Sequence, residues 1–362
     1  MAVLQAIAVL ALLILVHELG HFMAARLQGI HVNRFSIGFG PILWKYQGAE
    51  TEYAIRGFPL GGFVGFPDDD PDSQIPPNDP NLLRNRPLFD RAIVISAGVI
   101  ANLVFAYLLL VSQVGIVGIP RANQPGVLIP EIVSQTSSAA LKAGIQPKDV
   151  ILAVNGKDVG YAPNAIIYLK KEIESHANQP LNLTVQRGEI ILNITVTPQT
   201  GEDGKGKIGV GLAANGEIVR QRVGNIFAAF KEAAKEFQRL VTLTVQGFGQ
   251  LLGNFSKTAE QVAGPVKIVA IGANIAQSDA ASLFEFAALI SINLALINIL
   301  PLPALDGGQL AFLLLEGLRG KPLPTHIQDG VMQTGLMLIL GLGIFLIIRD
   351  TSQLPAIQQL FE

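Results

Sequence analysis

Four long stretches of this 362-residue chain are almost free of charged side chains. A membrane-spanning helix needs about 20 consecutive, mostly apolar residues. The stretches are Ala2–Val16, which continues through His17–Ala25 with one acidic residue, and Ala92–Ile119, Ser282–Leu305 and Val331–Ile348. Only 15% of all residues are charged, against about 25% in ordinary soluble domains. The sequence therefore predicts an α-helical protein with four transmembrane helices in a lipid bilayer.

Basic residues are concentrated in two of the loops between these segments. Lys and Arg recur between Leu27 and Arg91, with Arg26 at the edge, and the short loop before the last segment carries Arg319 and Lys321. By the positive-inside rule, both loops are predicted to be cytoplasmic and both termini, with the long central segment, external. No Arg- and Ser-rich transit segment precedes the first helix, which favours a bacterial inner membrane over a plastid.

The end of the first apolar segment reads His-Glu-Leu-Gly-His, from residue 17 to residue 21. Positions i and i+4 share one face of a helix, so His17 and His21 can reach one zinc ion, with Glu18 beside them as a base. Ionisable groups within an apolar span are costly unless a partner compensates them. The chain has no cysteine, so any metal must be bound by histidine and carboxylate.

Asp306 is the best candidate for a third ligand, since catalytic zinc usually has three protein ligands. It follows Pro301 and Pro303, which end regular helix within the third apolar segment. Irregular backbone at membrane depth must lie inside protein or beside a wet cavity, and Asp306 is expected to point there. The alternative is that Asp306 only caps the next helix, Gly307–Leu318. The unfinished zinc site in the same membrane favours ligation.

These motifs resemble the site-2 protease family of intramembrane zinc metalloproteases, and more narrowly its bacterial regulator-of-sigma-E protease branch. The resemblance extends in order along nearly the whole chain, through His17–His21, Gly61-Gly62, Ser96–Asn102, Ala263–Val266 and Asn298–Gly308. One departure is that Val99 follows Gly98 where family members often have proline.

The resemblance implies a role for each residue of the motifs. His17, His21 and Asp306 would be the ligands of a Zn²⁺ cofactor, and Glu18 the catalytic base. Asn298 would contact the substrate. The activity implied is cleavage of transmembrane segments of single-pass membrane proteins, such as anti-sigma factors or remnant signal peptides.

The segment Thr51–Phe66 has two short apolar runs around turn residues, which predicts a β-hairpin. A substrate helix must be unwound before cleavage, because its carbonyl groups are bonded internally. The resemblance implies a membrane re-entrant β-sheet whose edge pairs with the extended substrate through Gly61, Gly62, Phe63 and Val64. An ordinary cytoplasmic turn is the alternative.

The external segment is predicted to hold one β-rich domain of the α+β type. Its composition indicates four strands and two helices: Val127–Val133, Asp149–Val154, Leu181–Gln186, Ile190–Thr197, Ser137–Ala143 and Pro163–His176. It resembles a permuted PDZ domain, which implies that a peptide C-terminus adds as a strand beside Gly126, Val127, Leu128 and Ile129. The alternative is a steric plug that binds nothing.

The polar segment Thr200–Lys207 is predicted to be a loop or linker. Val223–Leu252 is predicted to be an amphipathic helix that rests on the membrane surface or on the external domain. A plain packing helix is the alternative. The predicted domains are an N-terminal membrane half, a PDZ domain, linker helices and a C-terminal membrane half, at 1–119, 120–215, 216–281 and 282–362.

The primary prediction is a zinc-dependent intramembrane endopeptidase. A non-catalytic membrane adaptor that presents a PDZ domain is the alternative, although an adaptor has no use for a buried acid. A metal transporter would need further acidic or histidine side chains along a path through the membrane, and the apolar segments offer almost none. A net charge of −2 gives no basic surface for nucleic acid.

Overall fold

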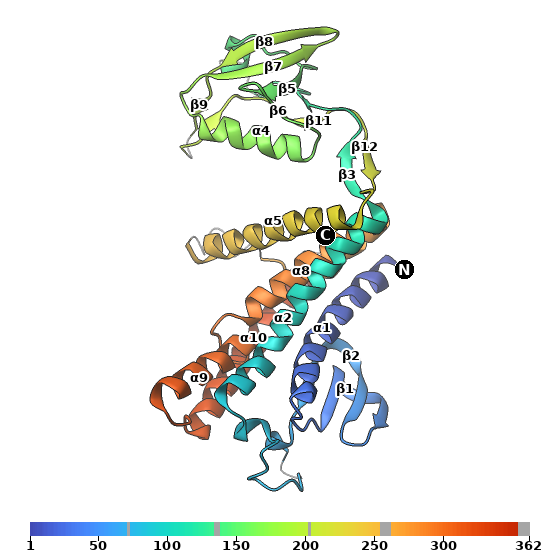
Figure 1. Cartoon of the computed structure of the whole chain (residues 1–362), viewed down its shortest axis with the longest axis vertical. Helices are drawn as coiled ribbons and strands as arrows, with labels where there is room; N and C mark the ends of the chain where they lie inside the picture. Colours follow the sequence, from blue (N-terminus) through green and yellow to red (C-terminus); the bar gives the residue numbers. More distant parts are fainter. Residues whose placement is uncertain (71–72, 134–137, 202–203, 254–261, 354–362) are drawn as a thin grey trace. The chain divides into compact units, whose positions relative to one another are not determined.

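The computed structural model describes residues 1–70, 73–133, 138–201, 204–253 and 262–353. The chain divides into two compact units (Figure 1). The first, called the membrane unit below, combines Met1–Gln113 with Asn225–Glu362. The second, called the β-rich domain, is Val114–Gly224. This unit includes the predicted 120–215 and extends beyond it to take in Ile119 of one strand and the whole of the strand Ile218–Gln221.

Four helices in the described ranges are long and apolar enough to cross a membrane, which confirms the four predicted spans. They are α1 (Ala2–Leu27), α2 (Leu88–Ser112, continued by one π-helical turn), α8 (Leu283–Asn298, preceded by the 3₁₀ turn Ala280–Ser282) and α10 (Thr325–Ser352). Large apolar side chains of α10 are exposed, with Met337 at 73% and Leu338 at 69%. A lipid environment explains such a surface, which water would penalise.

Helix α2 packs along both α1 and α8. The contact with α1 is close because residue 20 is glycine: a Cβ there would lie 2.5 Å from the carbonyl oxygen of Ala97. On the other side, Ala288 and Ala295 of α8 are fully buried, and Ser291 Oγ donates a 2.8 Å hydrogen bond to the carbonyl oxygen of Asn102. Small residues allow membrane helices to approach in this way.

Helix α5 (Ile226–Gly253) packs against α2 and α8, and the predicted contact with the membrane surface stays a prediction. Tyr107 Oη donates to the carbonyl oxygen of Phe230, and Arg239 pairs with Glu285 at 3.0 Å. Helix α7 (Pro265–Ser278) packs against α1 and α10.

The predicted break after α8 is confirmed. Helix α8 ends at Asn298 and α9 runs from Asp306 to Arg319, with Pro301 and Pro303 between them. The chain folds back tightly here, since a Cβ on Gly307 would lie 2.2 Å from the carbonyl oxygen of Leu300. The first turn of α9 is thereby held against the irregular segment.

Strands β1 (Arg34–Gln47) and β2 (Glu52–Gly65) form a sheet in which each strand bends. Residues 34–37 pair in parallel with 52–55 on one side and antiparallel with 62–65 on the other, while 42–47 pairs antiparallel with 52–56. The bends fall at glycines with positive φ, namely Gly38, Gly40 and Gly61 at +84°, +85° and +103°, values that L-residues rarely adopt.

The predicted hairpin within Thr51–Phe66 is therefore wrong in its pairing. Its two halves do not pair with each other, because 34–37 lies between them. Among the described residues, 62–65 is paired on one side only, which makes it an edge of the sheet. A β-sheet is present here, and half of it comes from Arg34–Gln47, for which no strand was predicted. Its re-entry into the membrane stays a prediction.

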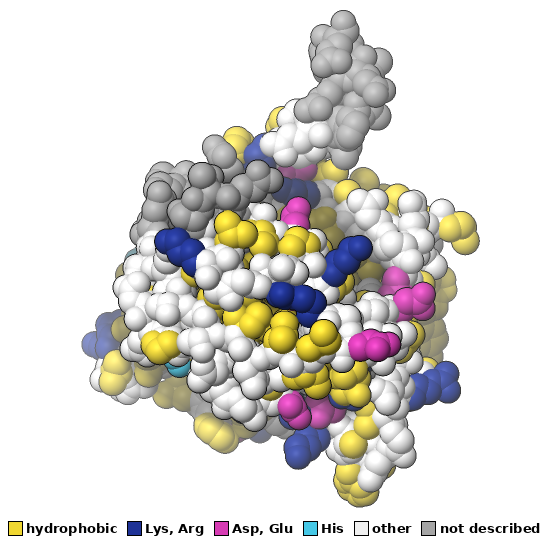
Figure 2. Space-filling model, turned by 90° about the horizontal axis from the view of Figure 1, so that it is seen from above, with side chains coloured by type: hydrophobic (Ala, Val, Ile, Leu, Met, Phe, Trp, Pro, Cys, Tyr) yellow, Lys and Arg dark blue, Asp and Glu magenta, His cyan; other side chains and the backbone are white. Residues whose placement is uncertain are grey.

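The β-rich domain contains an antiparallel sheet with strand order β11-β4-β5-β7-β8, and β6 pairs with β5. The strands are Ala213–Ala214, Val127–Leu128, Val150–Val154, Leu181–Arg187, Ile190–Val196 and, for β6, Lys157–Asp158. Helix α4 (Asn164–Ser175) buries Ala165, Leu169 and Ile173 in the core. Basic and acidic side chains are interspersed on the face shown in Figure 2.

Most predicted elements of this domain are observed, with some differences. The β7–β8 hairpin turns at Gly188, whose φ is +61°. Helix α3 is short, Ala139–Lys142, and the predicted start at Ser137 lies outside the described residues. The predicted loop at 200–207 instead contributes strands β9 (Gln199–Thr200) and β10 (Gly206–Lys207), which pair with each other.

Strands β3 (Ile119–Ala122) and β12 (Ile218–Gln221) form an antiparallel ribbon at the ends of the domain. The domain is thus an insertion whose entry and exit strands are paired.

Candidate metal centre

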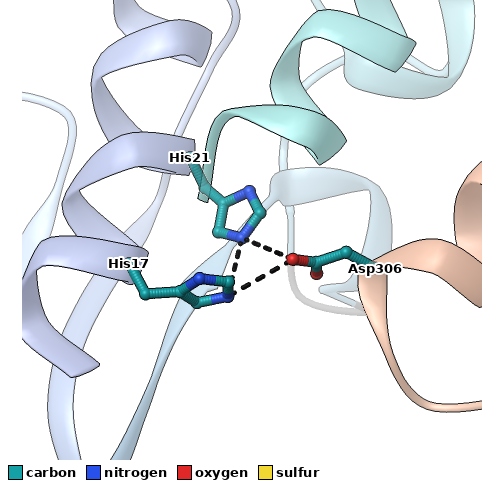
Figure 3. Close-up of side chains that lie close together, drawn as sticks. All are labelled: His17, His21 and Asp306. Atoms are coloured by element: carbon teal, nitrogen blue, oxygen red, sulfur yellow. Dashed lines mark hydrogen bonds and ion pairs between the residues drawn. The ribbon is translucent and has the colours of Figure 1, made fainter. Parts of the chain in front are cut away.

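Three side chains from two distant parts of the chain point toward one another (Figure 3). His17 and His21 lie one turn apart on α1, and Asp306 is the first residue of α9. His17 Nε2 lies 3.2 Å from His21 Nε2, and Asp306 Oδ2 lies 3.3 Å from the former and 3.5 Å from the latter. The side chains are largely buried, with exposed fractions of 12%, 12% and 14%.

These separations fit a zinc ion. Ligand atoms about 2.0–2.1 Å from a tetrahedral zinc lie about 3.3–3.4 Å from one another, and two imidazoles with one carboxylate are a common catalytic donor set. Asp306 Oδ2 is buried and, within the described part of the chain, makes no hydrogen bond of acceptable geometry. A buried carboxylate oxygen without a hydrogen bond is unfavourable unless a cation compensates it.

The orientation of His21 suits metal binding. Its Nδ1 lies 2.8 Å from the carbonyl oxygen of Val94, an acceptor, so Nδ1 carries the proton and donates it. The lone pair of Nε2 then faces the other two candidate ligands. Space for both rings depends on Gly98, since a Cβ there would lie 2.3 Å from His21 Nε2 and 2.7 Å from His17 Cε1.

Asp306 does not cap α9. The N-cap residue is Leu305, and Asp306 occupies the first helical position. The capping alternative for Asp306 is therefore not what is observed. The sharp return of the chain before α9 directs its carboxylate toward α1 instead (Figure 3).

Glu18 lies beside the edge of the β1–β2 sheet. A Cβ on Gly62 would come within 2.8 Å of Glu18 Cγ and 3.5 Å of Glu18 Cδ. Gly62 pairs with Ile37, and Phe63, next along the edge, lies against the guanidinium of Arg56 at 5.5 Å. The candidate base and the predicted substrate edge are thus neighbours.

Three further predicted residues occupy this region. Asn298, the last residue of α8, places Nδ2 3.3 Å from His17 Nε2. Val64 packs against the cluster formed by Ala25 and Val94, so its backbone, not its side chain, is the part available at the edge. Gly61 lies at the bend before the edge strand.

The predicted peptide groove at Gly126, Val127, Leu128 and Ile129 is corrected by the sheet order. Strand β4 is paired with β11 on one side and with β5 on the other. The backbone N–H of Gly126 donates to Gly160, and that of Ile129 to Asp149. Both edges are occupied, so no peptide strand can add there without displacing β11.

Three residues of α2 that touch the histidines have no role predicted from the sequence. These are Val94, Gly98 and Asn102, which lie four residues apart on one face. The available signal was a glycine and an amide at helical spacing in a span without charged residues, where polar groups are expensive.

Comparison with known proteins identifies the family of this chain. The sequence profile of peptidase family M50 matches residues 5–342. The chain is a member of peptidase family M50, the site-2 proteases. A "Putative zinc metalloprotease" of Nostoc sp. is 66% identical to this M50 protein over 366 residues, covering 100% of both chains. "Membrane metalloprotease ARASP, chloroplastic" of Arabidopsis thaliana is 50% identical over 362 residues, covering 99% of this chain and 80% of its own.

A more distant relative, "Protease RseP" of Yersinia pestis, is 29% identical over 448 residues, covering 96% of this chain and 98% of its own. Family membership and these relatives make the M50 protein a zinc-dependent metalloprotease, and its four apolar helices make it an integral membrane protein.

Proposed function

We propose that this M50 protein is an intramembrane endopeptidase in which His17, His21 and Asp306 hold the zinc ion. The observation that carries the proposal is the convergence of these three ligand atoms, 3.2–3.5 Å apart, from a membrane-spanning helix and from the break after another. Without a metal, the buried Oδ2 of Asp306 faces two imidazoles and makes no hydrogen bond of acceptable geometry within the described residues.

Glu18 is proposed as the general base and acid. When bound, zinc supplies Lewis acidity and lowers the pKa of a water molecule toward about 7. The Glu18 carboxylate takes a proton from water as the oxygen adds to the substrate carbonyl carbon. It then gives this proton to the departing amine nitrogen as the C–N bond breaks. Water is consumed, and no bond forms between enzyme and substrate.

The proposed substrate is the transmembrane segment of a single-pass membrane protein, such as an anti-sigma factor or a remnant signal peptide. Its carbonyl groups are bonded internally until the helix unwinds. The singly paired edge at 62–65 offers backbone groups to an extended strand beside Glu18. The amide of Asn298, close to His17, is placed to hydrogen-bond the same strand.

The proposed location is a bacterial inner membrane, with both termini and the β-rich domain outside. Support comes from the basic residues of the 27–91 loop and of the loop around Arg319 and Lys321. We propose that the β-rich domain acts as a size filter, which admits substrates already trimmed outside the membrane. A peptide groove at 126–129 is not part of this proposal.

The test compares Glu18→Gln with wild type in a reconstituted cleavage assay. The purified variant should keep its zinc and lose about 10²–10⁴-fold in rate, the usual contribution of general acid–base catalysis. Glu50→Gln is the matched control, because Glu50 is an exposed surface acid that pairs with Arg26. Full cleavage by Glu18→Gln would refute the mechanism, and a fully functional protein without zinc would favour the adaptor alternative.

A further inference from the structure

We propose that Asn102 is the positioning residue of His17: its side-chain oxygen accepts a hydrogen bond from His17 Nδ1–H and so directs Nε2 to the metal. The inference rests on the zinc site proposed above. It assigns a function to a residue of α2 that is neither a ligand nor a group that touches substrate.

Asn102 lies on the face of α2 that serves both histidines. Val94, Gly98 and Asn102 are spaced four residues apart, and residues with this spacing share a face of a helix. Val94 offers its carbonyl oxygen to His21, and Gly98 offers only space. Asn102 faces the remaining ring, that of His17.

The amide of Asn102 lies next to the ring nitrogen that is not aimed at the metal site. The amide nitrogen Nδ2 is placed 3.4 Å from His17 Nδ1, and the residue is 0% exposed. The oxygen and nitrogen of an amide are exchanged by a half turn, and their assignment follows from the hydrogen bonds they must make. The atom facing His17 is therefore decided by the proton on the ring.

Zinc ligation determines which ring nitrogen of His17 carries the proton. If the amide nitrogen faced His17, Nδ1 would have to accept, and a neutral ring would then carry its proton on Nε2, the atom 3.3 Å from Asp306. Such a ring cannot bind metal through Nε2. With the amide oxygen facing His17, Nδ1 is the donor and the Nε2 lone pair is free, which is the arrangement His21 already has with Val94.

The position of Asn102 is itself fixed from the other side. Ser291 of α8 is fully buried and donates to the backbone carbonyl oxygen of Asn102 at 2.8 Å. The backbone is thus bonded to α8 while the side chain faces α1. In the described residues, the side-chain oxygen makes no hydrogen bond, so turning it toward His17 breaks no bond of that oxygen.

A merely structural role would use Asn102 as a polar contact between helices, for which either amide atom serves. Two variants distinguish the structural role from the positioning role. Asn102→Asp keeps an oxygen acceptor and removes the amide donor. Asn102→Leu keeps similar bulk and removes both the donor and the acceptor. The control is Ser96→Ala on the same helix, because Ser96 Oγ donates only to carbonyl groups of its own helix.

The measurements use the full-length purified protein, with zinc affinity determined by chelator competition and the visible spectrum recorded after cobalt substitution. We expect Asn102→Leu to lower zinc affinity about 10–100-fold, the usual cost of losing such a partner, and to change the cobalt spectrum. Asn102→Asp and Ser96→Ala should bind zinc as wild type does or more tightly.

An unchanged zinc affinity in Asn102→Leu would overturn the inference, as would an equal loss in Asn102→Asp. If Asn102→Leu does not fold, Asn102→Asp decides alone. Retained zinc affinity in Asn102→Asp supports the proposal, because only the acceptor is then required. A loss of zinc affinity overturns it, because the amide donor then mattered. Failure of the wild-type protein to bind zinc would instead overturn the proposed metal centre itself, which distinguishes the two failures.

Discussion

Gly62 at the sheet edge lies against Glu18 of α1 so closely that a Cβ on residue 62 would come within 2.8 Å of Glu18 Cγ. The contact joins the candidate base to the strand proposed to hold the substrate. Because the same Cβ would also lie 2.9 Å from the carbonyl oxygen of Ser36, neither neighbour offers room, and the edge strand or Glu18 must shift if the glycine is replaced.

The first prediction concerns this contact. Gly62→Ala should lower the cleavage rate about 10²-fold, the order expected when a catalytic group is displaced by about 1 Å, while zinc affinity stays unchanged. Gly57→Ala is the matched control on the same strand, since a Cβ there meets only Pro41 at an ordinary 3.5 Å. Equal activity of both variants in the reconstituted assay would contradict the proposed role of the edge.

The second prediction concerns the space between the histidines and α2. Gly98→Ala should weaken zinc binding about 10–100-fold, because the added methyl group would occupy the place of the His21 ring nitrogen. Chelator competition measures the change. Gly115→Ala, at the end of the same span with nothing within 4 Å of its Cβ position, should bind zinc normally. Tight binding by Gly98→Ala would show that the rings sit elsewhere.

The third prediction concerns the pH dependence of the β-rich domain. Burial disfavours the charged carboxyl of Asp149, but hydrogen bonds from Arg187 at 2.8 Å and from the Gln146 backbone N–H outweigh burial and lower the pKa of Asp149. A lowered pKa stabilises the fold above the unfolded value of about 3.9, and this stability is lost as pH falls through the folded pKa.

Hydrogen exchange of β5 and β7 amides in the intact protein tests this. Asp149→Asn should destabilise the domain by about 2 kcal/mol near neutral pH, the order of hydrogen bonds to a charged group, and should flatten the loss of protection below about pH 4. Asp158→Asn, with an exposed side chain on β6, is the control. Unchanged protection at neutral pH in Asp149→Asn would rule out the stabilising role of the pair.

The fourth prediction uses the ribbon that closes the β-rich domain. Ala122 pairs with Ile218, and Asn123 N–H donates to Glu217, so residues 123–217 can be replaced by a short Gly/Ser linker. The shortened enzyme should cleave trimmed substrates at the wild-type rate and should gain cleavage of untrimmed ones. If it cleaves only trimmed substrates, the domain is no size filter.

The membrane helices and the metal-site candidates were predictable because their signals are local or rare. A run of about 20 apolar residues predicts a span by itself, and i, i+4 spacing brings His17 and His21 together on any helix. Asp306 could be chosen because few ionisable residues occur at membrane depth. The fold confirms its proximity to both rings.

The sheet was predicted less well because its pairing is not local. The strand between the two halves of 51–66 comes from 34–37, and bends at Gly38 and Gly61 let one strand serve two partners. Two apolar runs around a turn look like a hairpin in sequence whether or not they pair. The same limit explains why the pairing of β4 with β11 was not predicted. Strand β11, Ala213–Ala214, has only two residues and gives no strand pattern in the sequence.

The candidate ligands also lie far apart in the order of synthesis. His21 and Asp306 are separated by 285 positions (306 minus 21), with the whole β-rich domain encoded between them. A nascent chain that has inserted only its first two helices carries two of the three proposed ligands. The proposed centre can therefore be completed only after translation has passed Asp306 and α9 has packed against the first helices.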